Sequence, residues 1–187
     1  MHSSRPSPTE YAPYFNRYID LVAEADFIAV LAGQPAEFAA LLGALSQQQA
    51  SFRYAPGKWS VREVVGHVVD AERVFGYRAL CVARGEKASL PSFDENAYAA
   101  KAGHDACPLH ELLEELAHVR RGHIALFEHL DQAAWERTGT VNQNAISVRG
   151  LAYIMTGHAQ HHAGILKERY AAVLGGQTAK RSSRQHG

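Results

Sequence analysis

The amino-acid sequence predicts an all-α protein that folds as a four-helix bundle. Two observations predict this fold. Four long segments carry apolar residues at the spacing of a helix face, and no stretch alternates apolar and polar residues as a strand does. The chain has 187 residues, the size of one domain, and 47% of them are hydrophobic. Four amphipathic helices in a chain of this length are typical of a bundle.

The first two predicted helices cover residues 24–45 and 60–84. Pro35 falls inside the first, where it is expected to break or kink the helix. A loop at 51–59 separates the two. The second helix begins with Ser-Val-Arg-Glu, a capping box in which the serine and glutamate side chains each bind a free backbone amide, and Gly85 ends it. The second helix therefore has a defined start and end.

The last two predicted helices cover residues 108–130 and 148–174. A long connection with proline and glycine leads from the second helix to the third, and its length indicates a crossover rather than a tight turn. A polar loop at 139–144 leads to Ser147, which is expected to be the N-cap of the fourth helix. The predicted bundle thus has one long crossover, between its second and third helices.

Both ends of the chain are polar and lack apolar periodicity. Residues 1–10 and 175–187 are therefore expected to be disordered tails on a bundle domain that spans residues 11–174. The first ten residues contain no apolar segment that would form a secretory signal, and no stretch reaches the roughly 18 apolar residues of a membrane span. Lys and Arg number 19, as do Asp and Glu, so the charge indicates neither a nucleic-acid nor a membrane partner. We expect a cytoplasmic protein whose partners are small molecules or proteins, with a small-molecule substrate favoured.

The fourth helix carries three of the eleven histidines within five residues. His158 and His162 are four residues apart, so their imidazoles lie on one face of the helix, one turn apart. At about 100° per residue, that face is also the apolar one, with Leu151, Ile154, Met155 and Ile165 beside His158. Buried imidazoles need partners, because an unpaired buried polar group costs about 1–3 kcal/mol. A metal ion would satisfy both, and hydrogen-bonded histidines are the alternative.

His67 lies in an apolar run of the second helix, Val-Val-Gly-His-Val-Val. Helical geometry places it at the edge of the buried sector, where a ligand shared with another helix could lie and where a hydrogen-bonded core histidine is also common. Together, His67, His158 and His162 would supply three neutral nitrogen donors, which suit Zn, Ni, Fe or Cu. Three protein ligands would leave one coordination position open, as in catalytic metal sites.

Three neighbours are candidates for positioning these imidazoles. Glu63 is one turn before His67 and Asp70 is three residues after it, so either carboxylate could orient an imidazole or act as an acid or base. His161 points further from the apolar stripe and is expected to flank the site. The carboxylates have structural alternatives: Glu63 belongs to the capping box, and Asp70 and Glu72 are expected to form surface or interhelical ion pairs with Arg73 or Arg78. The remaining histidines of the connection and the third helix are expected on the surface: His104, His110, His118, His123 and His129.

A family resemblance rests on a set of spaced residues. Trp59-Ser60 is followed by Glu63, His67, Asp70, Glu72 and Arg78, then by the run Leu90–Glu95, and finally by the histidine motif that starts at His158 and ends at Gly164. Over residues 11–172 this pattern resembles the DinB/YfiT-like family of metal-binding four-helix bundles. The family's metal ligands map onto His67, His158 and His162, so the resemblance implies one divalent transition metal, with Zn, Ni and Fe not distinguished.

The resemblance implies one of two kinds of enzyme, and two non-catalytic interpretations are the alternatives. Some relatives are thiol-dependent transferases that use bacillithiol, mycothiol or glutathione, and others are described as metal-dependent hydrolases. Either activity would use the open coordination position and a small-molecule substrate. A non-catalytic metal-binding or stress-response module that acts through protein partners is the alternative, and a bundle with vestigial histidines is a third. The resemblance also implies a homodimer, for which no residue pattern here gives independent evidence.

Overall fold

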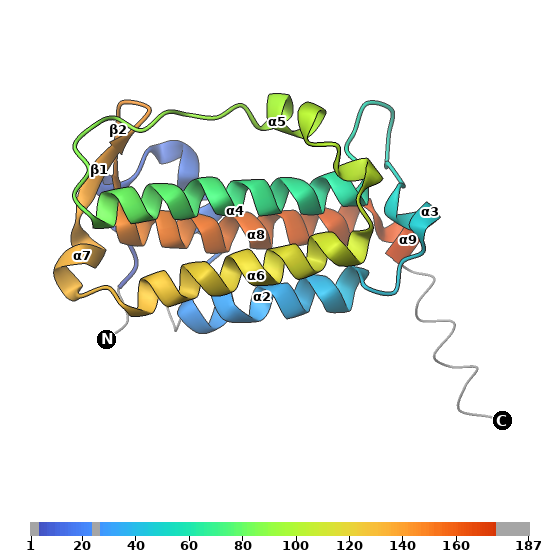
Figure 1. The fold of residues 1–187 in the computed structure, drawn as a ribbon, viewed down its shortest axis with the longest axis horizontal. Helices are drawn as coiled ribbons and strands as arrows, with labels where there is room; N and C mark the ends of the chain where they lie inside the picture. The colour runs from blue at the N-terminus through green and yellow to red at the C-terminus, as the bar shows by residue number, and fades with distance from the viewer. Residues whose placement is uncertain (1–3, 24–26, 175–187) are drawn as a thin grey trace.

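The computed structural model describes residues 4–23 and 27–174, and its fold is a four-helix bundle (Figure 1). The bundle consists of α2 (Phe27–Leu42), α4 (Val61–Ala83), α6 (Leu109–Glu128) and α8 (Val148–Arg169). Helix α4 packs against α6 and α8, and α2 packs against the same two helices. The predicted fold class is confirmed. Within the described ranges, no helix has the length and apolar character needed to cross a membrane.

The residues predicted to begin and end the helices have these roles in the structure. The Ser60 hydroxyl accepts a hydrogen bond from the backbone amide of Glu63, whose carboxylate accepts one from the amide of Ser60. Gly85 follows α4 with a φ of 83°, a left-handed conformation that favours glycine. Ser147 caps α8 by accepting from the amide of Gly150. These caps fix where the two helices that carry the histidines begin.

Helix α2 continues through Pro35, where the sequence predicted a break or kink. Proline has no amide hydrogen, so the carbonyl of Leu31, four residues earlier, loses its helical partner. The buried guanidinium of Arg120 on α6 donates a hydrogen bond to that carbonyl over 2.6 Å. A side chain from a neighbouring helix thus replaces the missing backbone bond, and sequence spacing alone gives no sign of it.

The crossover returns the chain along the whole bundle, so α6 begins at the same end as α4 (Figure 1). It contains α5 (Glu95–Ala102) and the 3-10 helix η3 (His104–Ala106), and both pack against α4. The predicted crossover is therefore present. The other short helices are α1 (Asn16–Ile19), α3 (Gln47–Ala50), α7 (Gln132–Glu136) and α9 (Ala171–Leu174).

A β-hairpin occupies the segment that the sequence predicted as a polar loop, and that expectation was wrong. Strands β1 (Thr138–Val141) and β2 (Asn144–Ser147) pair antiparallel, with Thr138 opposite Ser147. Asn142 and Gln143 have φ values of 47° and 63°, which match the tight turn that joins two strands. Each strand has only four residues, too few for an alternation of apolar and polar residues to be recognised in the sequence. The hairpin places polar turn residues beside α4.

The N-terminal segment packs on the bundle, which differs from the disordered tail expected for residues 1–10. Residues 4–10 are described, and they include the 3-10 helix η1 (Pro8–Glu10), which Ser7 caps. Glu10 forms a two-pronged ion pair with Arg149 of α8, over 2.5 and 2.6 Å. A second 3-10 helix, η2 (Pro13–Phe15), runs into α1, which lies against α8. The predicted tail at 175–187 lies outside the described residues.

Candidate metal centre

The three predicted histidine ligands come together between α4 and α8. One nitrogen of each of His67, His158 and His162 lies within 4.8 Å of those of the other two. The Nε2 atoms of His67 and His158 are 3.1 Å apart. On α8 the four-residue spacing puts His158 and His162 on one face, with ring centroids 4.5 Å apart. Each imidazole thus points at the same small volume.

Burial keeps these imidazoles neutral. The exposed fractions of His67, His158 and His162 are 3%, 3% and 8%. Loss of water lowers the pKa of His67 from 6.5 to about 4, with a smaller contribution from His104. The pKa values of His158 and His162 are also well below 6.5, mainly through burial and then through neighbouring histidines. At neutral pH all three therefore offer lone pairs, the form in which histidine binds metals.

The donor geometry fits a divalent transition metal. Zinc–nitrogen bonds of about 2.0–2.1 Å in a tetrahedral site place two donors about 3.3–3.4 Å apart. The 3.1 Å between the Nε2 atoms of His67 and His158 is close to this separation. Three imidazoles suit Zn, Ni or Fe, and their chemistry does not select among them. The residues present can therefore hold the ion that the sequence predicts.

Aromatic rings fix the orientation of the ligands. Trp59 lies against His67 with ring centroids 4.8 Å apart, and Tyr18 and Phe75 present their edges to His158 at 5.3 and 5.5 Å. Trp59 directly precedes the α4 cap, and its contact with His67 adds a role beyond that of an apolar residue at a helix start. Sequence reasoning missed Tyr18, since the chain between it and the histidines is long.

Gly157 allows the N-terminal segment to approach the site. A Cβ atom at this position would lie 2.0 Å from the backbone carbonyl oxygen of Tyr18. Any larger residue at 157 would displace α1, since the obstructing atom belongs to the backbone. The glycine beside His158 thus lets Tyr18 reach the imidazole.

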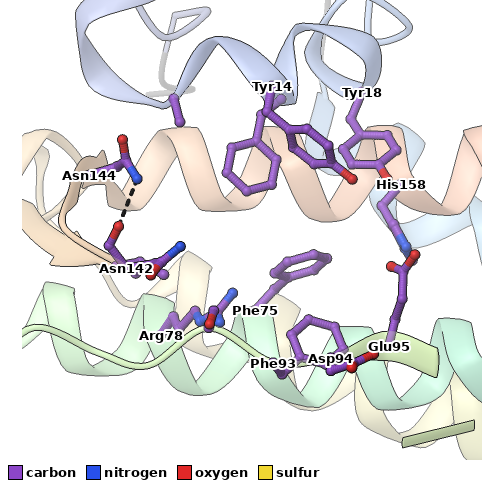
Figure 2. A pocket seen from close by; sticks show the side chains of 14 residues that line it. Tyr14, Tyr18, Phe75, Arg78, Phe93, Asp94, Glu95, Asn142, Asn144 and His158 are labelled. Atoms are coloured by element: carbon purple, nitrogen blue, oxygen red, sulfur yellow. Dashed lines mark hydrogen bonds between the residues drawn. The ribbon is translucent and has the colours of Figure 1, made fainter. Parts of the chain in front are cut away.

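A cavity of about 400 Å³ lies beside the histidines, and His158 forms part of its wall (Figure 2). The N-terminal segment, α4, the start of the crossover and the hairpin turn enclose it. Its lining comprises Ala12, Tyr14, Phe15, Tyr18, Phe75, Arg78, Ser92, Phe93, Asp94, Glu95, Val141, Asn142, Asn144 and His158. Aromatic rings make up much of the wall, which is typical of small-molecule sites. A ligand in this cavity would lie next to the candidate metal site.

Glu63 and Asp70 follow the structural alternatives that the sequence offered, and His161 flanks the site. The Glu63 carboxylate is engaged by the Ser60 amide and by Arg53. Asp70 faces Arg73 and His104 at 4.0 and 3.9 Å. Among the described residues, neither carboxylate forms a hydrogen bond with His67. His161 is half-buried outside the group of three, with its ring 5.5 Å from that of Tyr18.

A buried ion pair joins α4 and α6. Glu72 binds Arg120, and each side chain is 1% exposed. The Nδ1 atom of His123 lies 3.3 Å from the same carboxylate. The ion pair expected for Glu72 is present, but its partner is Arg120 and not Arg73 or Arg78. His123 was expected on the surface, and that expectation was wrong. His104 was also expected on the surface, yet its side chain is only 11% exposed.

Comparisons with known proteins agree with this architecture. The chain matches the DinB superfamily over residues 31–166. A protein of Geobacillus kaustophilus named "Putative metal-dependent hydrolase" is 27% identical over 143 residues, which cover 73% of this chain and 78% of that protein. Its namesake in Geobacillus thermodenitrificans is 26% identical with the same coverage.

Two solved structures share the fold. YfiT from Bacillus subtilis, described as "a probable metal-dependent hydrolase with an unusual four-helix bundle topology", has a TM-score of 0.74 at 18% identity, covering 92% of this chain and 94% of that one. Mycothiol-dependent maleylpyruvate isomerase has a TM-score of 0.62 at 11% identity, covering 78% of this chain and 61% of that one. The superfamily match spans well over half of the sequence, and this chain therefore belongs to the DinB superfamily.

Proposed function

We propose that this protein is a metal-dependent enzyme in which His67, His158 and His162 hold one divalent transition metal ion beside the substrate cavity. The observation that carries the proposal is the place of His158, which belongs both to the group of three donors and to the cavity wall. A fourth coordination position on the cavity side would be within reach of a substrate. A non-catalytic module would need either a filled coordination sphere or no accessible pocket beside the ion, so the cavity favours the enzyme.

Hydrolysis is the reaction that we favour. When bound, a divalent ion supplies Lewis acidity, which lowers the pKa of a water or a thiol and polarises a carbonyl group. The curated relatives are named as metal-dependent hydrolases, which supports water as the nucleophile. Transfer to a low-molecular-weight thiol is the second candidate, because a thiol-dependent isomerase shares the fold.

Two side chains of the cavity are suited to proton transfer beside His158. Glu95 extends from the start of α5 into the cavity, toward the end that His158 lines (Figure 2). Burial is the main cause of the raised pKa of Tyr18 and of the lowered pKa of His161. The negative charge of Glu95 adds to the increase at Tyr18 and opposes the decrease at His161, so it lies close to both. The Glu95 carboxylate can accept a proton from a nucleophile there. Burial raises the pKa of Tyr18, so its hydroxyl stays protonated and can donate a hydrogen bond to a substrate.

Reconstitution tests this function. The protein is stripped with a chelator, reloaded separately with Zn, Ni or Fe, and assayed with ester, amide and phosphate substrates, and with glutathione plus an electrophile. We expect turnover only after reloading, its loss in His158→Ala, and its retention in His118→Ala, which changes an exposed histidine of α6. Equal activity in stripped and reloaded protein would contradict the proposal, as would inactivity of every reloaded form across these substrates.

A further inference from the structure

The cavity has a cationic end that the metal centre does not explain. Arg78 lies on α4, eleven residues after His67, and lines the cavity away from His158 (Figure 2). The residue is 5% exposed. Its Nη2 atom donates a hydrogen bond to the backbone carbonyl of Pro91 over 2.6 Å. A guanidinium carries five N–H donors, and this neutral carbonyl accepts from only one of them.

The charge of Arg78 has no counter-ion in the part of the chain that the structure describes. No carboxylate oxygen lies within the ion-pair distance of 4.0 Å of its guanidinium there. The Asp94 carboxylate accepts from the backbone amides of Asn96 and Ala97 as the cap of α5. Burial lowers the pKa of Arg78, yet an arginine stays charged at neutral pH. A buried cation without a counter-ion is costly, so an anionic ligand would relieve that cost.

The surroundings of Arg78 combine apolar walls with polar side chains. Its guanidinium carbon is 5.7 Å from the centre of the Phe93 ring, and Phe75 also lines the space between Arg78 and His158 (Figure 2). Asn142 and Asn144 reach the same end from the hairpin turn, where the Asn144 side chain donates to the Asn142 carbonyl over 2.7 Å. This arrangement suits a carboxylate joined to an apolar body.

We propose that the cavity binds an apolar, aromatic-sized substrate that carries a carboxylate, with the carboxylate on Arg78 and the reacting bond near His158. The placement of the reacting bond rests on the proposed function, whereas the carboxylate site does not need the metal. Asn142 and Asn144 surround the bound carboxylate, and Phe75 and Phe93 contact the body of the substrate. Arg78 therefore selects substrates by charge and sets their orientation toward the metal centre.

The binding test uses matched pairs of small molecules and metal-stripped protein. Benzoate, 3-phenylpropionate and 4-phenylbutyrate are each compared with the neutral primary amide of the same skeleton, and affinities are measured by ligand-observed NMR. Stripping the metal matters, because a carboxylate could otherwise bind the ion itself. We expect at least one carboxylate to bind about ten-fold or more tightly than its amide, as a charged hydrogen-bonded pair requires.

Variants test whether Arg78 causes the preference for a carboxylate over its amide. We expect Arg78→Met to abolish it and Arg78→Lys to retain part of it, since lysine keeps the charge without the two-pronged geometry. Arg84→Met, an exposed arginine just after the same helix, is the matched control and should keep the full preference. Melting curves show whether each variant folds. The comparison of acid with amide in the wild-type protein needs no substitution, so it tests the proposal even if a variant fails to fold.

The outcomes separate this proposal from the proposed enzymatic function. Equal affinity for acid and amide in every pair, or a preference seen only in metal-loaded protein, would overturn the carboxylate site. A preference unchanged in Arg78→Met would overturn it as well. Any of these results leaves the metal-dependent reaction intact, while a carboxylate preference in a protein that fails to bind metal would refute the enzyme and keep this site.

Discussion

The Nε2 atoms of His67 and His158 lie 3.1 Å apart, although 91 positions separate the two residues in the chain. Two protonated imidazoles at this distance would repel each other, and burial adds to that cost. The pair is therefore stable when at least one ring is neutral, joined by a hydrogen bond in the metal-free protein or by an ion between them.

Acid should destabilise the metal-free protein. The pKa of His67 is about 4 in the folded protein against 6.5 for the ordinary side chain, so between these values the unfolded chain binds more protons. Stability should be highest above about pH 6.5 and should fall as the pH drops toward about 4, with His67 contributing about 3 kcal/mol. Urea unfolding of chelator-treated protein across this range measures the slope.

The variant His67→Gln isolates this contribution from that of the carboxylates. Its stability should depend less steeply on pH than that of the wild type, while His118→Gln, at an exposed position, should keep the wild-type slope. A wild-type stability that stays flat or rises on acidification between about pH 6.5 and 4.5 would contradict the burial argument.

Gly157→Ala should destabilise the protein and disturb the site. The added methyl group would meet the Tyr18 carbonyl oxygen at 2.0 Å, so α1 must move away from α8 at a cost of about 1–3 kcal/mol. Gly164→Ala on the same helix meets no atom within 4 Å and should stabilise by roughly 0.5–1 kcal/mol. Urea unfolding of both variants checks the contrast, and equal effects would show that α1 does not pack as closely as described.

Arg120→Met should be strongly destabilising. It would leave the Glu72 carboxylate buried without its main partner and free the Leu31 carbonyl that Pro35 already deprives of a helical bond. Breaking one partner of a buried pair costs about 3–5 kcal/mol. Arg73→Met, which breaks the exposed pair with Glu115, should cost about 1 kcal/mol or less. Similar losses in the two variants by urea unfolding would contradict a structural role for the buried pair.

The sequence predicted the bundle and the convergence of the histidines because both depend on local helical geometry. The spacing of His158 and His162 and the cap at Ser60 are fixed within one helix turn, so no tertiary information is needed to see them. His67 is different, since helical spacing left it at the edge of a buried face. Only the family resemblance identified it as an expected ligand, and in the structure it lies against His158.

The cavity could not be predicted, because much of its wall comes from segments without helical periodicity. Tyr18 belongs to a one-turn helix, and Asn142 lies in a hairpin turn of two short strands. Arg120 was missed as the partner of Glu72 for a different reason: charged residues are assigned to the surface unless a buried partner is known. The homodimer that the family resemblance implies and the cytoplasmic location expected from the sequence stay predictions.

The affinity of the protein for Zn²⁺, measured by competition with a chromophoric chelator, tests the central claim most directly. We expect one ion per chain in the wild type, unchanged affinity in His118→Ala, and a loss in His158→Ala of more than about 100-fold, beyond the effect typical of a residue that only supports a ligand. Equal affinity in the wild type and His158→Ala, or no binding by either, would contradict a metal centre at His67, His158 and His162.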